Sequence, residues 1–322
     1  MTLNSDMENI TFEQFESLNF SFYSGNPVLK YTLPSMVVAD PSILTPDKTP
    51  DKKWHLFAHT FFGVYHYVSE DGISFSKGKR VAQRAMRPDV NVINGEYYLY
   101  FERTREPILN ALNSLGVKWK SEIYMCKSAD LEVWTEPQLV IGHTRDFEGC
   151  KSGVAISNPF LTEIDGKYRL YYSCGLTFIK DCGFSEPTHI TFAEGSFPDK
   201  GFVSRKTPII SPDKSNKYLN LCSGCIKVYK LKDCYIGLQN GIFEENGSSH
   251  SAIMLLKSDD GENFTFVKPL IGPDKKYPWM AQFVYACCMT SYDGKIRIYF
   301  NARNVANMVK GRESIGFIEA EI

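Results

Sequence analysis

The chain has 322 residues, 43% of them apolar and 14% aromatic, and its 36 lysines and arginines balance 37 aspartates and glutamates. A net charge near zero gives no electrostatic attraction for nucleic acid or for an anionic membrane. The first residues, MTLNSDMENITFEQF, lack the apolar core of a secretory signal, and no stretch approaches the roughly 18 apolar residues of a membrane span. We therefore expect a cytoplasmic protein with neither a nucleic-acid nor a membrane partner.

Nine cysteines are scattered along the chain, and only Cys222 and Cys225, in the segment CSGC, have the CxxC spacing. No second pair stands at the distance that a four-ligand zinc site needs. We interpret the cysteines as reduced, mostly buried thiols, with a zinc site or a redox pair at Cys222 and Cys225 as the alternative.

A repeated unit organises the chain after an N-terminal extension, residues 1–25, in which one short helix is expected within residues 7–18. Each unit has an apolar strand, a polar turn and an aromatic strand. The copies open with Asp40-Pro-Ser-Ile, Arg87-Pro-Asp-Val, Ser157-Asn-Pro-Phe, Ser223-Gly-Cys-Ile and Gln282-Phe-Val-Tyr. Three copies contain two-residue hairpin turns, at Asn94-Gly95, Asp165-Gly166 and Asp293-Gly294.

A second kind of turn follows most copies, with serine, aspartate and an aromatic residue, in Ser69–Phe75, Ser128–Trp134 and Ser258–Phe264. We interpret these turns as structural, because serine and aspartate there bond nearby backbone amides. Five copies of four strands predict an all-β fold, a five-bladed β-propeller with four-stranded antiparallel blades, as a single domain over residues 1–322. The N-terminal segment is expected to supply the outer strand of the last blade. Residues 104–120 and 176–187 are expected to be loops.

The predicted fold indicates which side chains meet. In an antiparallel blade the start of the first strand, the end of the second and the start of the third lie on one face. Polar and charged residues occupy the first two of these positions, whereas the serine-aspartate turns lie on the opposite face. We therefore expect a binding site on the first face. Its candidate substrate-binding residues are His59, Arg87, Glu102, Arg103, Asn158, Gln282 and Arg303.

The segment Ala39-Asp-Pro-Ser-Ile43, with a second acidic residue opening the second blade, resembles the five-bladed β-propeller glycosidase superfamily. That superfamily includes arabinanase and β-xylosidase types (family 43-like), invertase types and mannoside phosphorylase types. The resemblance covers residues 26–322 and implies a carbohydrate-active enzyme that cleaves glycosidic bonds with inversion. It also implies that Asp40 is the general base and that Asp89 tunes and orients the reacting groups.

The chain departs from the family pattern at the general acid. Hydrolase members carry a glutamate two residues before a proline in the third blade, where this chain has Ser157. Glu148, on the approach to that strand, is the candidate for the acid, and Glu102 is a second one. The second blade reads Arg-Pro-Asp where invertase-like members read Arg-Asp-Pro, so Asp89 is displaced by one residue, which exchanges faces in a strand.

Two other functions follow from these departures. A phosphorylase-like enzyme needs a single catalytic aspartate and holds phosphate with basic residues, for which Arg87, Arg103 and Arg303 are suited. The same arginines could hold a nucleotide sugar, or the propeller could bind a glycan without chemistry. Phe61, Phe62 and Trp279 are candidates for stacking on a sugar ring. No organic cofactor and no protein metal site are predicted, although a channel-bound calcium or other cation stays open.

Overall fold

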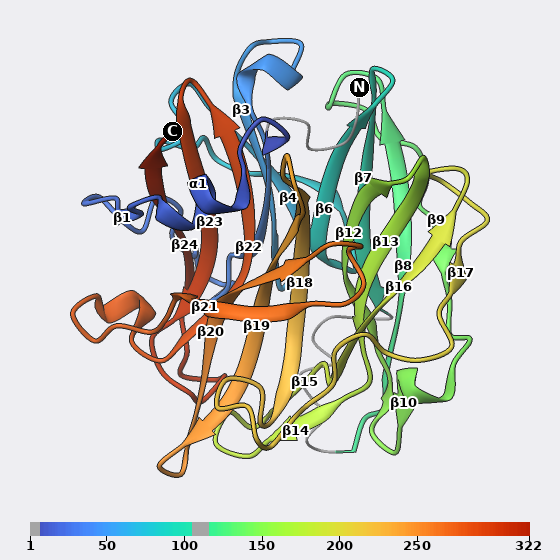
Figure 1. Ribbon diagram of the computed structural model, residues 1–322, viewed down its shortest axis with the longest axis vertical. Helices are drawn as coiled ribbons and strands as arrows, with labels where there is room; N and C mark the ends of the chain where they lie inside the picture. The colour runs from blue at the N-terminus through green and yellow to red at the C-terminus, as the bar shows by residue number, and fades with distance from the viewer. Residues whose placement is uncertain (1–6, 105–115) are drawn as a thin grey trace.

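The computed structural model describes residues 7–104 and 116–322, and strands dominate that part of the chain (Figure 1). Its one α-helix there, α1 (Phe12–Ser17), begins at a capping box in which Thr11 and Gln14 bond each other's backbone amides. Short 3-10 turns occur at Pro46–Lys48, Asp146–Glu148 and Pro278–Met280. None of the helices in the described ranges has the length and apolar character to cross a membrane.

The strands pair in antiparallel sets of four, because apolar and aromatic residues recur in short runs separated by turn residues. The first two sets are β2 (Ala39–Leu44), β3 (Trp54–Thr60), β4 (Gly63–Ser69), β5 (Lys79–Ala82), and β6 (Ala85–Ile93), β7 (Glu96–Thr104), β8 (Trp119–Ser128), β9 (Gln138–Ile141). The next two are β12 (Ile156–Ile164), β13 (Lys167–Cys174), β16 (His189–Gly195), β17 (Val203–Ser204), and β18 (Cys222–Lys230), β19 (Tyr235–Glu245), β20 (Ser248–Ser258), β21 (Thr265–Ile271).

The last set joins the two ends of the chain. Strands β22 (Phe283–Tyr292), β23 (Lys295–Arg303) and β24 (Glu313–Glu321) form a meander, and β1 (Ser21–Phe22) pairs with β24. The Asn26 side chain strengthens this join, since it donates to the carbonyl of Phe317 at 2.7 Å and accepts from its amide at 3.0 Å. The N-terminal segment therefore covers the edge of the final strand.

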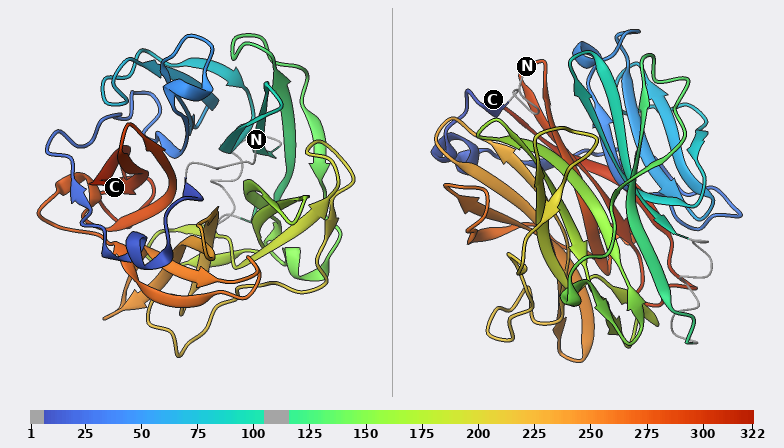
Figure 2. Two further views of the ribbon diagram at one scale, coloured as in Figure 1. Left: turned by 45° about the horizontal axis from the view of Figure 1, so that its top comes forward. Right: turned by 90° about the vertical axis from the view of Figure 1, so that its right-hand side faces the viewer.

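The sets are arranged around a central axis (Figure 2). The innermost strands contact one another in cyclic order, β2 with β6, β6 with β12, β12 with β18, β18 with β22, and β22 with β2. Aromatic residues fill the spaces between sheets, as expected for the buried Trp54, Tyr97, Tyr98 and Tyr172. The sheets therefore surround the axis with the start of each innermost strand on one face.

Both kinds of predicted turn are present. Asn94-Gly95, Asp165-Gly166 and Asp293-Gly294 each have positive φ at both residues, the geometry that lets a two-residue turn follow the twist of its strands. In the serine-aspartate turn after β4, Asp71 accepts from the amides of Ile73 and Ser74 at 2.8 and 2.7 Å. Asp130 and Asp260 make the same bonds in the turns after β8 and β20.

The prediction of plain loops needs correction. Residues 176–187 contain a two-stranded hairpin, β14 (Thr177–Ile179) with β15 (Phe184–Glu186), at the lower end of the molecule in Figure 1. Ile179, Cys182 and Phe184 pack into an apolar cluster with Ile242 and Phe283, which gives this connection a core of its own. A further small hairpin joins β10 (Gly149–Cys150) and β11 (Gly153–Val154). Residues 105–115 of the other predicted loop lie outside the described residues.

Candidate active site

A bulge interrupts each innermost strand at the same place and directs residues into a pocket on the axis. In β2, β6 and β12 the bulge residues are Asp40-Pro41, Arg87-Pro88 and Asn158-Pro159, two residues opposite one on the neighbouring strand. Proline disfavours right-handed helical backbone for the residue before it. Asp40, Arg87 and Asn158 all take left-handed backbone, with φ of 53°, 53° and 51°. Three different side chains thus reach one pocket from one backbone geometry.

In the fourth set the equivalent bulge residue is Gly224. A Cβ atom at this position would lie 2.1 Å from Oδ1 of Asn240, so only glycine leaves room for that amide. Asn240 lines the pocket and donates to the carbonyl of Val284 at 2.8 Å. In this set the side chain that reaches the pocket is therefore that of Asn240 on β19, because Gly224 on the innermost strand β18 has none.

Asp40 is the carboxylate at the centre of this arrangement, with 13% of its side chain exposed. Its Oδ2 lies 3.0 Å from Nδ1 of His59, and its amide donates to Asn301 at 3.2 Å. Burial raises the pKa of Asp40, but the hydrogen bond and charge of His59 and the charges of Arg87 and Lys227 outweigh burial and leave the pKa below its usual value. Asp40 is therefore a carboxylate at neutral pH.

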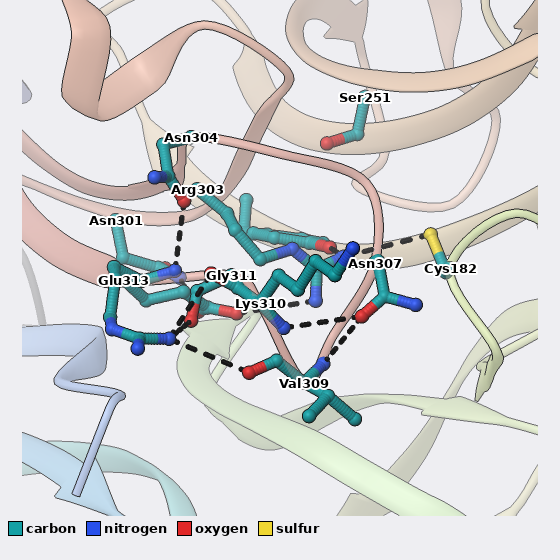
Figure 3. A network of polar contacts seen from close by, with 12 residues as sticks. Cys182, Ser251, Asn301, Arg303, Asn304, Asn307, Val309, Lys310, Gly311 and Glu313 are labelled. Atoms are coloured by element: carbon teal, nitrogen blue, oxygen red, sulfur yellow. Dashed lines mark hydrogen bonds and ion pairs between the residues drawn. The ribbon is translucent and has the colours of Figure 1, made fainter.

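The two arginines that line the pocket each have an acidic partner. Arg87 forms an ion pair with the fully buried Glu102, which also accepts from the indole of Trp119 at 3.2 Å. Arg303 lies 3.6 Å from Glu313, and both are shown in Figure 3. Arg303 also donates to the hydroxyl of Tyr285. Both guanidinium charges are thus largely balanced by the protein.

Glu313 also belongs to the network in Figure 3, since its Oε2 accepts from Nδ2 of Asn301 at 2.9 Å. The same Asn301 side chain accepts from the amide of Asp40, so one residue links the two carboxylates. Burial raises the pKa of Glu313 and the Asp40 charge adds to this, against the lowering effect of Arg303, His59 and the Asn301 bond. Glu313 is therefore a positioned carboxyl group beside Asp40.

Glu186 is the third acidic residue of the pocket, and sequence analysis missed it. It ends β15, lines the pocket with 8% of its surface exposed, and no hydrogen bond to its carboxyl group is found within the described ranges. Burial raises the pKa of Glu186 to about 7, with the charges of Glu313 and Asp40 adding to the rise and those of Arg87 and Arg303 opposing it. Two carboxyl groups of one pocket thus have pKa values moved in opposite directions.

The other predicted binding residues are divided between the pocket and its surroundings. His59, Arg87, Asn158 and Arg303 line the pocket, and Phe61 does so among the predicted stacking residues. Glu102 lies behind Arg87. Four more residues do not line it: Arg103 lies over the Tyr124 ring, Gln282 bonds Ser249, Trp279 stacks on Phe300, and Phe62 is 39% exposed outside the pocket.

Asp89 and Glu148, predicted as catalytic, lie elsewhere. Asp89 corresponds in register to Ser42, after the bulge, and lines a second cavity along the axis. It accepts from the amide of Leu161 on β12 at 2.9 Å, just as Ser42 accepts from Val90 on β6, so both residues join neighbouring sheets. Glu148 is fully buried and accepts from the amides of Thr144 and Arg145 and from the Tyr172 hydroxyl.

A usable indication of the missed residues was present in the sequence. Trp119 and Glu313 begin the third strands β8 and β24, and Glu186 stands just before the third strand β16. Third-strand starts lie on the pocket face by the same rule that selected first-strand starts and second-strand ends. The rule points to Trp119 and Glu313, but strand ends next to long connections are hard to find from sequence, and Glu186 belongs to a hairpin that the rule does not cover.

A metal site is not indicated by the described part of the chain, where no group of three or more histidine, cysteine or acidic side chains is arranged to hold an ion. Cys222 and Cys225 are buried free thiols on β18, and burial raises the pKa of both.

Comparisons with known proteins identify structures that share this fold. No protein-family model matches the chain, and no curated protein matches it in sequence. Solved structures match over nearly its whole length. The catalytic domain of a GH62 α-L-arabinofuranosidase from Coprinopsis cinerea has 12% identity and a TM-score of 0.66, covering 94% of this chain and 97% of that one. An α-L-arabinofuranosidase from Lactobacillus brevis has 13% identity and a TM-score of 0.63, covering 91% and 92%.

A β-1,2-mannobiose phosphorylase from Listeria innocua, solved with β-1,2-mannobiose, has 12% identity and a TM-score of 0.65, covering 95% of this chain and 97% of that chain. At such identities the likeness shows a shared fold. The chain therefore has the all-β fold found in these glycoside hydrolases and phosphorylases.

Proposed function

We propose that the chain is a single-domain, five-bladed β-propeller of the glycosidase superfamily. The cyclic contacts of the innermost strands β2, β6, β12, β18 and β22 support this, as does the pairing of β1 with β24. The fold shared with arabinofuranosidases and a mannobiose phosphorylase supports it independently. In this arrangement the candidate pocket lies at the axis, where such folds combine residues from several blades.

We propose further that the protein hydrolyses a glycosidic bond, with Asp40 as general base and Glu186 as general acid. One observation carries this: two carboxyl groups line one pocket, and their surroundings hold the pKa of Asp40 low and raise that of Glu186 to about 7. Hydrolysis of an acetal needs such a pair, one carboxylate to accept a proton and one carboxylic acid to donate one.

The proposed step balances as follows. Asp40 accepts a proton from a water molecule, whose oxygen forms a bond to the anomeric carbon of the sugar. The bond between that carbon and the glycosidic oxygen breaks, and Glu186 gives its proton to the departing oxygen. Asp40 leaves the step protonated and Glu186 ionised, and exchange with water restores both.

The surrounding residues support this assignment by what they bond. His59 and Asn301 hold the Asp40 side chain and backbone. The side-chain amide of Asn158 donates through Nδ2 to the Ser173 hydroxyl at 2.8 Å and to the carbonyl of Gly224 at 3.1 Å. These bonds direct the Asn158 Oδ1 away from Ser173 and Gly224. Such fixed polar groups can orient sugar hydroxyls without reorganising.

Phosphorolysis is the second candidate, because Arg87 and Arg303 both line the pocket and arginine binds phosphate well. The ion pairs with Glu102 and Glu313 weigh against it, since a phosphate dianion would have to compete with carboxylates already beside each guanidinium. A nucleotide sugar would meet the same competition at its pyrophosphate. Hydrolysis of a neutral sugar is therefore the first choice.

The test is a panel of aryl glycosides and disaccharides, incubated in buffer free of phosphate and again with inorganic phosphate or a nucleotide sugar. We expect release of a free sugar without phosphate, with its first-formed anomer inverted in proton NMR spectra. Turnover only with phosphate would establish the second candidate. Saturable sugar binding with no product in any arm would make the protein a binding module.

A further inference from the structure

Partly exposed apolar side chains contribute to the lining of the pocket. Val37, Phe61, Phe184 and Met308, here called the apolar collar, line the pocket and are each half-buried. They come from four separate segments: the stretch before β2, the β3–β4 turn, the β14–β15 hairpin and the β23–β24 connection. The polar and charged lining residues, by contrast, are carried by the strands of the four-stranded sets, except Glu186, which lies on the β14–β15 hairpin.

Contacts between the segments fix the collar. The amide of Phe61 donates to the Ser35 hydroxyl at 3.3 Å, which ties the β3–β4 turn to the stretch that carries Val37. The amide of Met308 donates to the carbonyl of Cys182 at 3.1 Å, which ties the β23–β24 connection to the hairpin that carries Phe184. Phe184 also packs edge-on against Trp119, with ring centroids 5.5 Å apart.

Further bonds give the β23–β24 connection one shape (Figure 3). Asn307 accepts from the amides of Val309 and Lys310 at 3.1 and 3.2 Å, and Asn304 accepts from the amide of Arg312 at 2.9 Å. The Arg312 guanidinium in turn donates to the carbonyl of Gly311 at 2.8 Å. Met308 is therefore held at the pocket by a structured connection.

The same four segments carry unusually exposed apolar residues outside the collar. Leu33, Phe178 and Val309 are 68%, 50% and 69% exposed, and Phe62 and Val305 are 39% exposed. A single exposed apolar residue needs no explanation, but several on the segments that carry the collar agree with a binding region there.

We propose that the apolar collar is a leaving-group subsite that takes an alkyl or aryl aglycone in preference to a second sugar. This rests on the proposed function, because the occupant is the group attached to the glycosidic oxygen. A sugar in the collar would present hydroxyl groups to Val37, Phe61, Phe184 and Met308, whose side chains offer them no hydrogen bond. An apolar chain there would leave water and bury its surface instead.

The experiment uses methyl, butyl and hexyl glycosides of the sugar cleaved best by the wild type, and a disaccharide with the same non-reducing sugar. Calorimetry on Asp40→Asn measures binding without turnover, and kcat/KM is measured on the wild type. We expect affinity to rise by up to about fourfold per added methylene while the chain lies in the collar. The disaccharide is expected to bind no better than the methyl glycoside.

Met308→Gln, of similar length but polar, is expected to lower the ratio of hexyl to methyl affinity by about tenfold, because it removes apolar contact from the collar. The control is Val133→Gln, an equally polar change at a 74% exposed valine on a serine-aspartate turn, which is expected to leave both affinities unchanged. A flat alkyl series, or a disaccharide bound more tightly than the hexyl glycoside, would overturn the proposal.

The two proposals fail in different ways. If the wild type cleaves some glycosides but is indifferent to the aglycone, only the collar proposal is wrong. If no glycoside is cleaved, the hydrolase assignment is wrong, and the calorimetric series with alkyl glycosides of the sugar that binds best still decides whether the collar takes an apolar group.

Discussion

The two ends of the sheets are built from the same strands, but they differ in how much the side chains at equivalent positions vary from one sheet to the next. At the end opposite the pocket, the turns after β4, β8 and β20 repeat one set of bonds, made by Asp71, Asp130 and Asp260. At the pocket end, one bulge geometry presents aspartate, arginine and asparagine in three successive sheets, and the fourth has glycine at the equivalent place. The comparison teaches that repetition of side chains indicates a structural role here, and that divergence at a repeated backbone position indicates the site.

The largest loss of activity is expected from substitution of Asp40, the proposed general base, which occupies the bulge position of the first sheet. Asp40→Asn keeps the size of the side chain but removes the proton acceptor, so we expect kcat on a cleaved glycoside to fall about 10²- to 10⁴-fold. Steady-state kinetics measure this, and the melting temperature shows whether the fold is kept. Activity close to that of the wild type would remove Asp40 from the chemistry.

The next largest loss of activity is expected from substitution of Glu186, and its dependence on the leaving group distinguishes a general acid from other carboxyl groups. Glu186→Gln cannot donate a proton, so we expect a loss of about 10²- to 10⁴-fold with an alkyl leaving group, which needs protonation. With a dinitrophenyl leaving group, which departs without a proton, we expect a loss of less than about tenfold. Equal losses with both would point to a binding or structural role for Glu186, and Glu148→Gln serves as the comparison for the acid predicted from sequence.

A smaller loss of activity is expected from substitution of Glu102, which pairs with Arg87 but does not line the pocket. Glu102→Gln weakens the ion pair that orients Arg87, and misplacement of a substrate-contacting group costs on the order of tenfold to a hundredfold in kcat/KM. Glu122→Gln on β8, which removes a carboxylate that does not line the pocket, is the matched control. If both variants match the wild type, Arg87 needs no partner to act.

The smallest effect on activity is expected at the opposite end, where only stability should change. Asp71→Ala removes bonds to the amides of Ile73 and Ser74, and we expect about 1 kcal/mol less unfolding free energy with unchanged kcat/KM. These bonds lower the pKa of Asp71 to about 2. Their stabilisation is therefore present above the ordinary pKa near 4 and lost as the pH falls toward 2. Urea unfolding of both proteins at pH 7 and pH 2 measures it, and a constant difference would contradict the account.

Much of the fold followed from sequence, because turn chemistry and alternating apolar residues act locally. Asn94-Gly95 fixes its hairpin whatever surrounds it, and the serine-aspartate turns bond within themselves. The site was harder to predict. Asp40, Arg87 and Asn158 follow from the repeat, but the β14–β15 hairpin that carries Glu186 depends on packing against Phe283 from a distant sheet.

Asp89 illustrates the same limit at one residue. Its acidity suggested a partner for Asp40, yet the bulge before it sets the register, so that Arg87 reaches the pocket and Asp89 bonds to Leu161. Comparison of the proline positions in Asp40-Pro41, Arg87-Pro88 and Asn158-Pro159 would have indicated this register. A repeat is therefore best aligned on its backbone-determining residues before its chemical ones.

The central claim is that two carboxyl groups with pKa values moved apart share one pocket and cleave a glycosidic bond. The pH dependence of kcat/KM on an alkyl glycoside tests it most directly. Asp40 must be ionised and Glu186 protonated, so we predict a bell-shaped profile, with an acid limb below the ordinary pKa of an aspartate and an alkaline limb near pH 7. In Glu186→Gln the residual activity is predicted to lose the alkaline limb. An alkaline limb that persists unchanged in this variant would contradict the account.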